Sequence, residues 1–477
     1  MKNSKLVKLI RTLSHEEFRR FHRYLKSPFF TTNKNLLALY EYLRKYHPDY
    51  DSPKLEKEIV FKKIFARASF NYAKFAALTQ SMTRLVEDYM LWINMQESPL
   101  LRQRHLLKIY NKRNLFEFYE RGYVRMLEKL KQPPYRDLEF YQEKLQLHAD
   151  YYFHPLNNKY DLEDDSLESF SDDLDVFFVI GKYRAVTALK NRERILSKKY
   201  PVRFLSTIKE NRQEGWLEGH YLVQLYELLF ELMEGQQHDT FFAFKKKMFQ
   251  HYHDLRSTDK ELLFYSGLNF AIGQINQGEE SFYKEALEWY KLSISSQLII
   301  ERGKINNVIF NNVVLLGCRE KEFVWTDHFI HNYGKYLSKS TRLDTILFSE
   351  SLLLFHQKKF QESMVKLCAH SFSKDFQPKV RLTMIRNNFE QFLIDDKYYE
   401  VLQSNIEAFE KYITRDKYFS YAKIESHIHC IRIIKKLSDK ILERPKKGTL
   451  ASWLEEEIAS RERVVVKDWL REKVETL

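Results

Sequence analysis

Gln357-Lys358-Lys359-Phe360 lies where one apolar helical pattern stops and an aromatic residue begins the next. Other turns in the C-terminal half repeat this arrangement, with Phe242, Tyr283, Phe323 and Tyr398 as their aromatic residues. Together with Phe360, these aromatics are 41, 40, 37 and 38 residues apart. A fixed period of about 20 to 50 residues is typical of stacked repeats, in which no unit buries its apolar face alone. The spacing therefore predicts an array of helical hairpins.

Composition favours an all-α protein. The chain has 477 residues but only 12 Gly and 10 Pro, fewer than the turns of a β protein require. Its hydrophobic fraction of 44%, with 36 Phe and 30 Tyr, provides enough apolar surface for stable cores. We therefore expect a helical N-terminal unit followed by a right-handed α-solenoid of helical hairpins.

The expected hairpins lie at 218–253, 259–296, 303–337, 342–371 and 377–412, and a sixth opens at 417–436. The second helix at Phe282–Tyr290 resembles those of the tetratricopeptide-repeat family. In that family an aromatic opens the second helix, and a small residue three positions later allows a tight helix crossing. The resemblance implies this role for Ala286, Thr326, Ser363 and Val401. Phe242 is instead followed by Lys245, and the period exceeds the family's roughly 34 residues, so we expect a divergent array.

Breaks in the apolar pattern divide the chain into four parts. We predict a basic helical unit at 1–97, a helical hairpin region at 98–215 with an acidic linker near 154–175, tetratricopeptide-like repeats at 216–440, and a capping helix at 441–477. Residues 450–477 have the pattern of one amphipathic helix, which would supply the polar cap that a solenoid needs. A helix on a membrane surface is the alternative, although Glu455–Glu457 on its polar side oppose binding to anionic lipid.

The N-terminal unit begins with a strong helix-start signal. Ser14 and Glu17 have the spacing of a capping box, and Ser27-Pro28 ends the helix that follows. The unit resembles the opening of a family of uncharacterised bacterial helical proteins in the stretches Leu13–Phe18, Leu25–Phe30, Leu55–Glu58 and Phe61–Phe65. This resemblance implies a helical fold and a bacterial cytoplasmic setting, and no activity.

Charge is distributed unevenly along a chain whose net charge is +13. Residues 1–30 hold eight Lys and Arg against two Glu, a local charge of +6. This unit is either a solvated helical surface or a helix-turn-helix reader of nucleic acid. Residues 161–175 hold eight carboxylates and no Lys or Arg. That stretch is either a solvated loop or an autoinhibitory flap that docks on basic residues such as Lys182 and Arg184.

The tetratricopeptide resemblance implies a groove lined by the first helices, where Asn and basic side chains hold a peptide. The corresponding residues are Asn269, Asn307, Asn311, Asn312, Arg386, Asn387 and Asn388. Asn is a weak helix former, so its repeated use inside helices indicates either contacts with a peptide or hydrogen bonds between neighbouring helices. Asn312 and Asn387 are the preferred groove contacts, because each precedes its aromatic by eleven residues.

Cysteine usage and hydropathy predict a cytoplasmic protein. Cys318, Cys368 and Cys430 lie far apart in apolar helical patterns, where we expect buried, reduced thiols. The sequence has neither an apolar run long enough to cross a membrane nor the pattern of an export signal.

Motifs for catalysis are missing from the sequence. It has no phosphate-binding Gly-Lys-Ser or Gly-Lys-Thr loop, glycine fingerprint or nucleophile elbow. His328 and His331 could share a helix face, but two ligands make a weak metal site. We therefore predict no catalytic, cofactor or metal residues.

The preferred function is a non-enzymatic scaffold or adaptor that recognises a peptide or protein partner in the groove of its repeats. The alternative is a nucleic-acid-associated regulator, in which the basic N-terminal unit contacts phosphates and the repeats sense a partner. A third reading is a toxin-like or transferase activity without local motifs.

Overall fold

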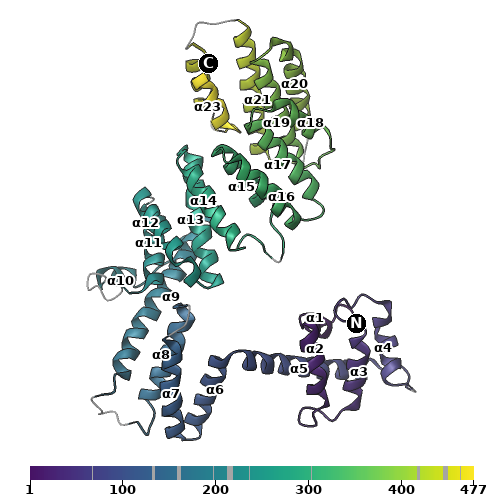
Figure 1. Cartoon of the computed structure of the whole chain (residues 1–477), viewed down its shortest axis with the longest axis vertical. Helices are drawn as coiled ribbons and strands as arrows, with labels where there is room; N and C mark the ends of the chain where they lie inside the picture. The colour runs from purple at the N-terminus through teal and green to yellow at the C-terminus, as the bar shows by residue number, and fades with distance from the viewer. Residues whose placement is uncertain are drawn as a thin grey trace. The chain divides into compact units, whose positions relative to one another are not determined.

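A computed structural model describes residues 1–66, 68–131, 135–157, 163–196, 198–211, 219–235, 237–301, 303–415, 419–443, 449–461 and 463–476. These residues form helices joined by short turns, and no strand occurs among them, as the composition predicts. None of the helices so described is long and apolar enough to cross a membrane. The chain divides into two compact units, Met1–Gln224 and Leu225–Leu477, which we describe separately (Figure 1).

The helices of unit 1 are α1 (Lys5–Ile10), α2 (His15–Lys26), α3 (Lys34–Arg44), α4 (Lys57–Ile64), α5 (Tyr72–Glu97), α6 (Pro99–Lys112), α7 (Phe116–Leu130), α8 (Leu138–Tyr152), α9 (Ser166–Leu196) and α10 (Leu205–Asn211). Buried apolar residues of α1–α5 share one core. The predicted capping box starts α2: the Ser14 hydroxyl accepts from the Glu17 amide, and the Ser14 amide donates to the Glu17 carboxylate at 2.6 Å.

The acidic stretch of unit 1 is partly helical, which corrects the expectation of a linker over 154–175. From Ser166 onward it belongs to α9, and Asp173 is buried with its Oδ1 atom 2.9 Å from Lys144 Nζ. Residues 166–175 cannot form a flap on Lys182 and Arg184, because they share one continuous helix with them and cannot fold back onto them. Residues 158–162 of the expected linker lie outside the described residues.

The next helices along the chain are α11 (Tyr221–Gly235), α12 (His238–His251), α13 (Ser257–Gln277), α14 (Phe282–Ser295), α15 (Asn307–Arg319), α16 (Phe323–Tyr333), α17 (Arg342–His356), α18 (Phe360–Cys368), α19 (Gln377–Phe392), α20 (Tyr399–Arg415) and α21 (Tyr421–Leu442). A helix pair occupies each of the five expected hairpin ranges, and α21 occupies the sixth opening. From α12 to α21 each helix packs on the next one in the chain. The first helices α15, α17 and α19 also pack on one another in succession.

The turn at Lys358 is a Schellman motif. Lys358 has a left-handed φ of 62°, its amide donates to the carbonyl three residues back at 3.0 Å, and the Lys359 amide donates to the carbonyl five residues back at 2.9 Å. The same pair of bonds and a positive φ close the helices that end before Asn114, Gly278 and Lys321. This turn satisfies the last carbonyls of one helix and reverses the chain into the next.

The aromatics after these turns mostly lie where the sequence predicts. Tyr283, Phe323 and Phe360 occupy the first or second position of α14, α16 and α18. Phe242 does not, because α12 already begins at His238, and its side chain is 44% exposed.

Of the four residues expected at tight helix crossings, three are buried and one is not. Ala286, Thr326 and Ser363 are fully buried. Val401 is 49% exposed, and the neighbouring Leu402 lies in the core instead. Cys318 and Cys430 are buried as expected, whereas Cys368 is exposed at the end of α18.

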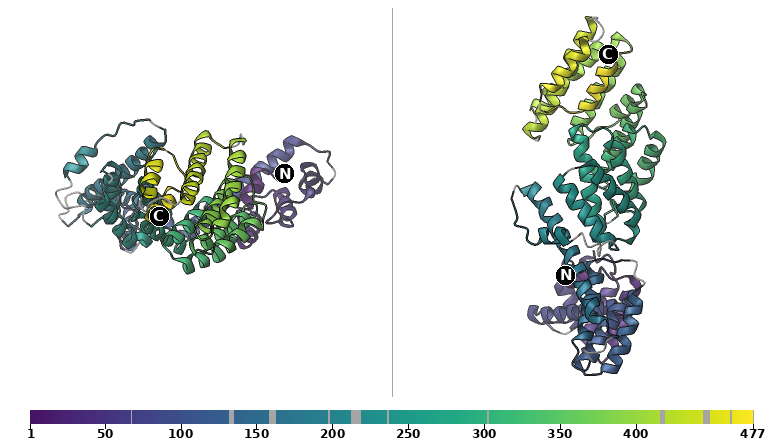
Figure 2. Two further views of the ribbon diagram at one scale, coloured as in Figure 1. Left: turned by 90° about the horizontal axis from the view of Figure 1, so that it is seen from above. Right: turned by 90° about the vertical axis from the view of Figure 1, so that its left-hand side faces the viewer.

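The C-terminal segment forms two helices, so the single helix expected over 450–477 is wrong. Helix α22 (Thr449–Ala459) and helix α23 (Lys467–Thr476) lie side by side (Figure 2). Val464–Val466 separate them, and Val466 has a left-handed φ of 48°. Consecutive β-branched residues favour helix poorly, which explains the interruption. Residues 444–448 of the expected capping segment lie outside the described residues.

Candidate functional site

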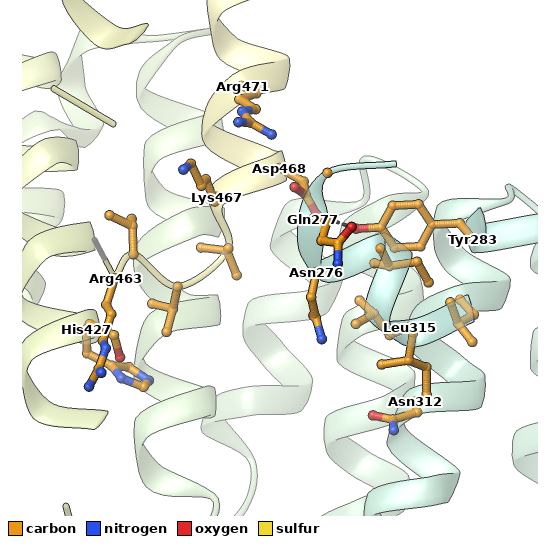
Figure 3. Close-up of a pocket in the computed structure, with 18 of the residues that line it drawn as sticks. Asn276, Gln277, Tyr283, Asn312, Leu315, His427, Arg463, Lys467, Asp468 and Arg471 are labelled. Carbon is orange, nitrogen blue, oxygen red and sulfur yellow. Dashed lines mark hydrogen bonds between the residues drawn. The ribbon is translucent and has the colours of Figure 1, made fainter. Parts of the chain in front are cut away.

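Unit 2 contains a cleft of about 930 Å³. On one side it is lined by the end of α13 and by α14 and α15, and on the other by α21 and the segment 463–468 at the start of α23 (Figure 3). Helices that are far apart in the sequence therefore meet at one site.

One wall of the cleft carries side-chain amides. Asn276 and Gln277 are exposed at the end of α13, and Asn312 lies beside them on α15. The Asn312 side chain hydrogen-bonds to the hydroxyl of Tyr290, which is buried in α14. Burial raises the pKa of Tyr290, so its hydroxyl stays protonated at neutral pH. This contact holds the Asn312 amide at the cleft.

The opposite wall carries cations. Lys423, Arg463, Lys467 and Arg471 line the cleft, and Asp468 is the only carboxylate among the lining residues whose positions are described. Within the part of the chain that the structure describes, none of these four cations forms an ion pair. His427 also lies here and donates from Nδ1 to the Lys423 carbonyl at 2.7 Å. Burial lowers the pKa of His427, so its ring is neutral at pH 7.

Helix α23 is joined to α14 and α15 by charged contacts. The Tyr283 hydroxyl donates to Asp468, and the Arg319 guanidinium pairs with Glu472. Arg319 also lies 3.8 Å from Asp468. Burial and the neighbouring Asp468 raise the pKa of Tyr283, which keeps its hydroxyl a donor.

Trp469 fixes the other face of α23 against α19. Its Nε1 atom donates to Glu390 at 2.7 Å, and Glu390 pairs with Lys473 at 2.6 Å. The Arg386 guanidinium lies 5.0 Å from the Trp469 ring and 4.3 Å from the Phe355 ring, close enough for cation–π attraction to both. Burial lowers the pKa of Arg386 to about 10, so it remains charged at pH 7. We call Tyr283, Arg319, Arg386 and Glu390 the α23 seat.

The residues expected in a groove do not share one site. Asn312 lines the cleft, and Arg386 belongs to the α23 seat. Asn269 is exposed on α13 outside the cleft, and Asn307 and Asn311 are half-buried on α15.

Asn387 and Asn388 are fully buried between helices. Asn387 donates to the Ser363 hydroxyl at 3.1 Å and to the Thr383 carbonyl at 2.9 Å. The Asn387 amide therefore joins α18 to α19. It makes a hydrogen bond between neighbouring helices, which is the alternative to contact with a peptide. Asn387 is not accessible to a partner in this structure.

The cationic wall was missed from the sequence. Arg463 and Lys467 come from the segment expected to be an outward cap, and Lys423 from the incomplete sixth hairpin. The sequence feature that could have predicted this wall is the run of three valines at 464–466. Valine is a weak helix former, so the run indicates a break between two helices, and the second helix can then pack against earlier ones.

Neither metal ligation nor a known relative points to a function. Among the residues whose positions are described, no group of three or more His, Cys, Asp or Glu could hold a metal ion. No protein-family model, curated protein or solved structure matches the chain. Function is therefore inferred from the geometry of the cleft.

Proposed function

We propose that this chain is a non-enzymatic scaffold or adaptor that binds a peptide or protein partner in the cleft of unit 2. The observation that carries this proposal is the pairing of an amide wall, with Asn276, Gln277 and Asn312, and a cationic wall across one open cleft. Side-chain amides can each donate and accept a hydrogen bond, which suits the alternating groups of an extended peptide backbone. We further propose that α11–α21 are a right-handed solenoid related to tetratricopeptide repeats.

The docking of α23 supports this proposal from within the chain. An amphipathic helix already lies against α14, α15 and α19, held by a buried Trp469 and by ion pairs at its rim. A large aromatic anchor surrounded by polar contacts is the usual composition of a protein-binding surface. This side of the helix array thus has the chemistry needed to hold polypeptide.

The nucleic-acid alternative has less support. Several cations of the N-terminal unit are used inside it: Lys2 and Arg11 donate to the carbonyls of Asp51 and Asp49, each at 2.5 Å. Lys5 pairs with Glu87 at 2.6 Å. Cations engaged in this way are less available to phosphates, so the local charge of +6 overstates the attraction to nucleic acid.

Site-specific photo-crosslinking tests the proposal. A photoreactive amino acid replaces Gln277 in the cleft, and in a matched control it replaces Val365, which is 67% exposed on α18 and outside the cleft. After mixing with lysate of the native cells and irradiation, we expect one protein adduct at position 277 that resists nuclease and is missing at position 365. Equal adducts at both positions, or adducts that nuclease removes, would contradict a peptide-binding cleft.

A further inference from the structure

We propose that the ligand of the cleft is an acidic peptide segment, and that α23 is a wall of this site rather than an outer cap. This inference rests on the proposed function and adds the chemistry of the partner. Among the described residues, four cations line the cleft against one carboxylate, and that carboxylate, Asp468, is already bonded to Tyr283 and close to Arg319. The free charge of the site is therefore positive.

These cations line one cleft without a carboxylate partner among the described residues, although Lys423 Nζ also lies 4.2 Å from the Phe419 ring. Lys423, Arg463 and Lys467 come from α21 and the start of α23, and they form no ion pair with any residue that the structure describes. Lys379 of α19 lies near Lys423, and burial together with the charge of Lys423 lowers the pKa of Lys379. Like charges gathered in a cleft create a field that attracts an anionic ligand.

The opposite wall favours a peptide over a nucleic acid. Binding of single-stranded nucleic acid depends on aromatic faces on which bases stack. The aromatic residues that line this cleft, Tyr283 and Tyr290, are 8% and 2% exposed, so their faces are covered. The amides of Asn276, Gln277 and Asn312 are instead suited to a peptide backbone. An extended segment between the walls would direct Asp or Glu side chains toward Arg463 and Lys467.

Helix α23 places part of the cationic wall. Arg463 and Lys467 lie just before and at the start of this helix, whose position depends on Trp469 in its seat and on the Arg319–Glu472 pair. Loosening α23 would move these cations away from the amides of α13 and α15. Weakening the contacts of Trp469 and Glu472 with the seat should therefore weaken ligand binding, even though neither of these two residues lines the cleft.

The first experiment measures binding of a labelled Glu-rich peptide to the full chain by fluorescence anisotropy. Its isosteric Gln-rich peptide, a phosphoserine peptide and a single-stranded oligonucleotide are the comparison probes. We expect the Glu-rich peptide to bind at least about tenfold more tightly than the Gln-rich peptide, with affinity falling as salt rises. Equal binding of the two peptides, or tighter binding of the phosphoserine peptide or the oligonucleotide, would overturn the assignment of an acidic peptide.

Charge-neutral variants locate the binding. The triple variant Lys423→Gln, Arg463→Gln, Lys467→Gln should lose about tenfold or more in affinity for the Glu-rich peptide. The matched control changes three exposed lysines of unit 2 that do not line the cleft: Lys246→Gln, Lys339→Gln and Lys411→Gln. It removes the same charge and should change affinity much less. Equal losses in both variants would show attraction to overall charge and refute a built site.

Variants of the α23 residues that contact the seat test the role of this helix. Trp469→Ala and Glu472→Gln should each reduce affinity for the Glu-rich peptide, and because Glu472 is half-exposed the second variant should keep the fold. Higher affinity in these variants would show that α23 blocks the site, and unchanged affinity would show that it is not a wall. The crosslinking experiment at position 277 tests the proposed function separately. If a protein adduct forms there but the Glu-rich peptide does not bind, the proposed function stands and the assignment of an acidic ligand is refuted.

Discussion

Replacing Gly267 with Ala should destabilise unit 2 through Trp289. A Cβ atom at Gly267 would lie 2.6 and 2.7 Å from two ring carbons of Trp289 and 2.9 Å from a ring carbon of Phe244, whereas ordinary contacts are 3.4–4 Å. Trp289 is fully buried, and its ring packs against those of Phe241, Phe244, Phe249 and Phe264, so it has little room to move. Overpacking of a core costs about 1–3 kcal/mol, and Ala returns about 0.5–1 kcal/mol of helix propensity. We expect a net loss of about 1–2 kcal/mol.

Gly273 provides the control on the same helix. It also lies within α13, but an added Cβ there would meet nothing within 4 Å. Gly273→Ala should therefore stabilise unit 2 by about 0.5–1 kcal/mol, as Gly to Ala does at an unobstructed helix position.

Denaturant unfolding of both variants, followed by circular dichroism, measures the change in the free energy of unfolding. Hydrogen exchange of α13 and α14 shows whether the destabilisation is confined to these two helices. We expect the two substitutions to have opposite signs. A Gly267→Ala protein as stable as the wild type would refute the packing described around Trp289.

Further predictions concern the buried polar groups and the turns. Burial lowers the pKa of His148 to about 4, so protonation opposes folding and stability falls as pH drops below about 6.5. The variant His148→Asn keeps a hydrogen-bond partner for Tyr123 but cannot be protonated. Between pH 7 and pH 5 it should therefore lose about 2 kcal/mol less stability than the wild type in denaturant titrations. An identical pH dependence in the variant would contradict this. Asn387→Ala should cost about 1 kcal/mol of stability and leave peptide affinity unchanged, whereas Asn312→Ala should lower affinity and also reduce stability, because it removes the hydrogen bond to the buried Tyr290 hydroxyl. Lys358→Gly should raise the thermal midpoint, because Gly adopts the left-handed φ of this turn without the backbone strain of about 0.5–1 kcal/mol that Lys carries there. Lys359→Gly changes a residue with negative φ and should lower the midpoint. Equal shifts of the two midpoints would contradict the turn geometry.

The hairpins could be predicted because their signals are local. A capping box at Ser14–Glu17, a proline at Pro28 and the aromatics at Phe323 and Phe360 each act within a few residues, and the structure has helix ends at these places. Their physical basis is backbone hydrogen bonding at helix ends, which sequence neighbours decide.

The cleft could not be predicted because it depends on contacts between distant segments. The apolar period of 450–477 is nearly continuous, so it predicts one helix and hides the turn at Val466 that redirects α23. The Asn pattern was equally ambiguous, since a polar residue on a first helix faces either a groove, as Asn312 does, or a neighbouring helix, as Asn387 does. Periodicity reports which residues face away from solvent, not which partner covers them.

The contacts of α23 have a consequence for the order of folding. Most packing in α12–α21 joins helices that are adjacent in the chain, whereas Tyr283 and Asp468 are 185 residues apart and Arg319 and Glu472 are 153 apart. Contacts between close neighbours form early, and those that close long loops form late. Because synthesis also proceeds from the N-terminus, the hairpins can assemble on the ribosome before the residues of α23 exist. The helix array would therefore form first, and the cleft would be completed only when α23 docks against it.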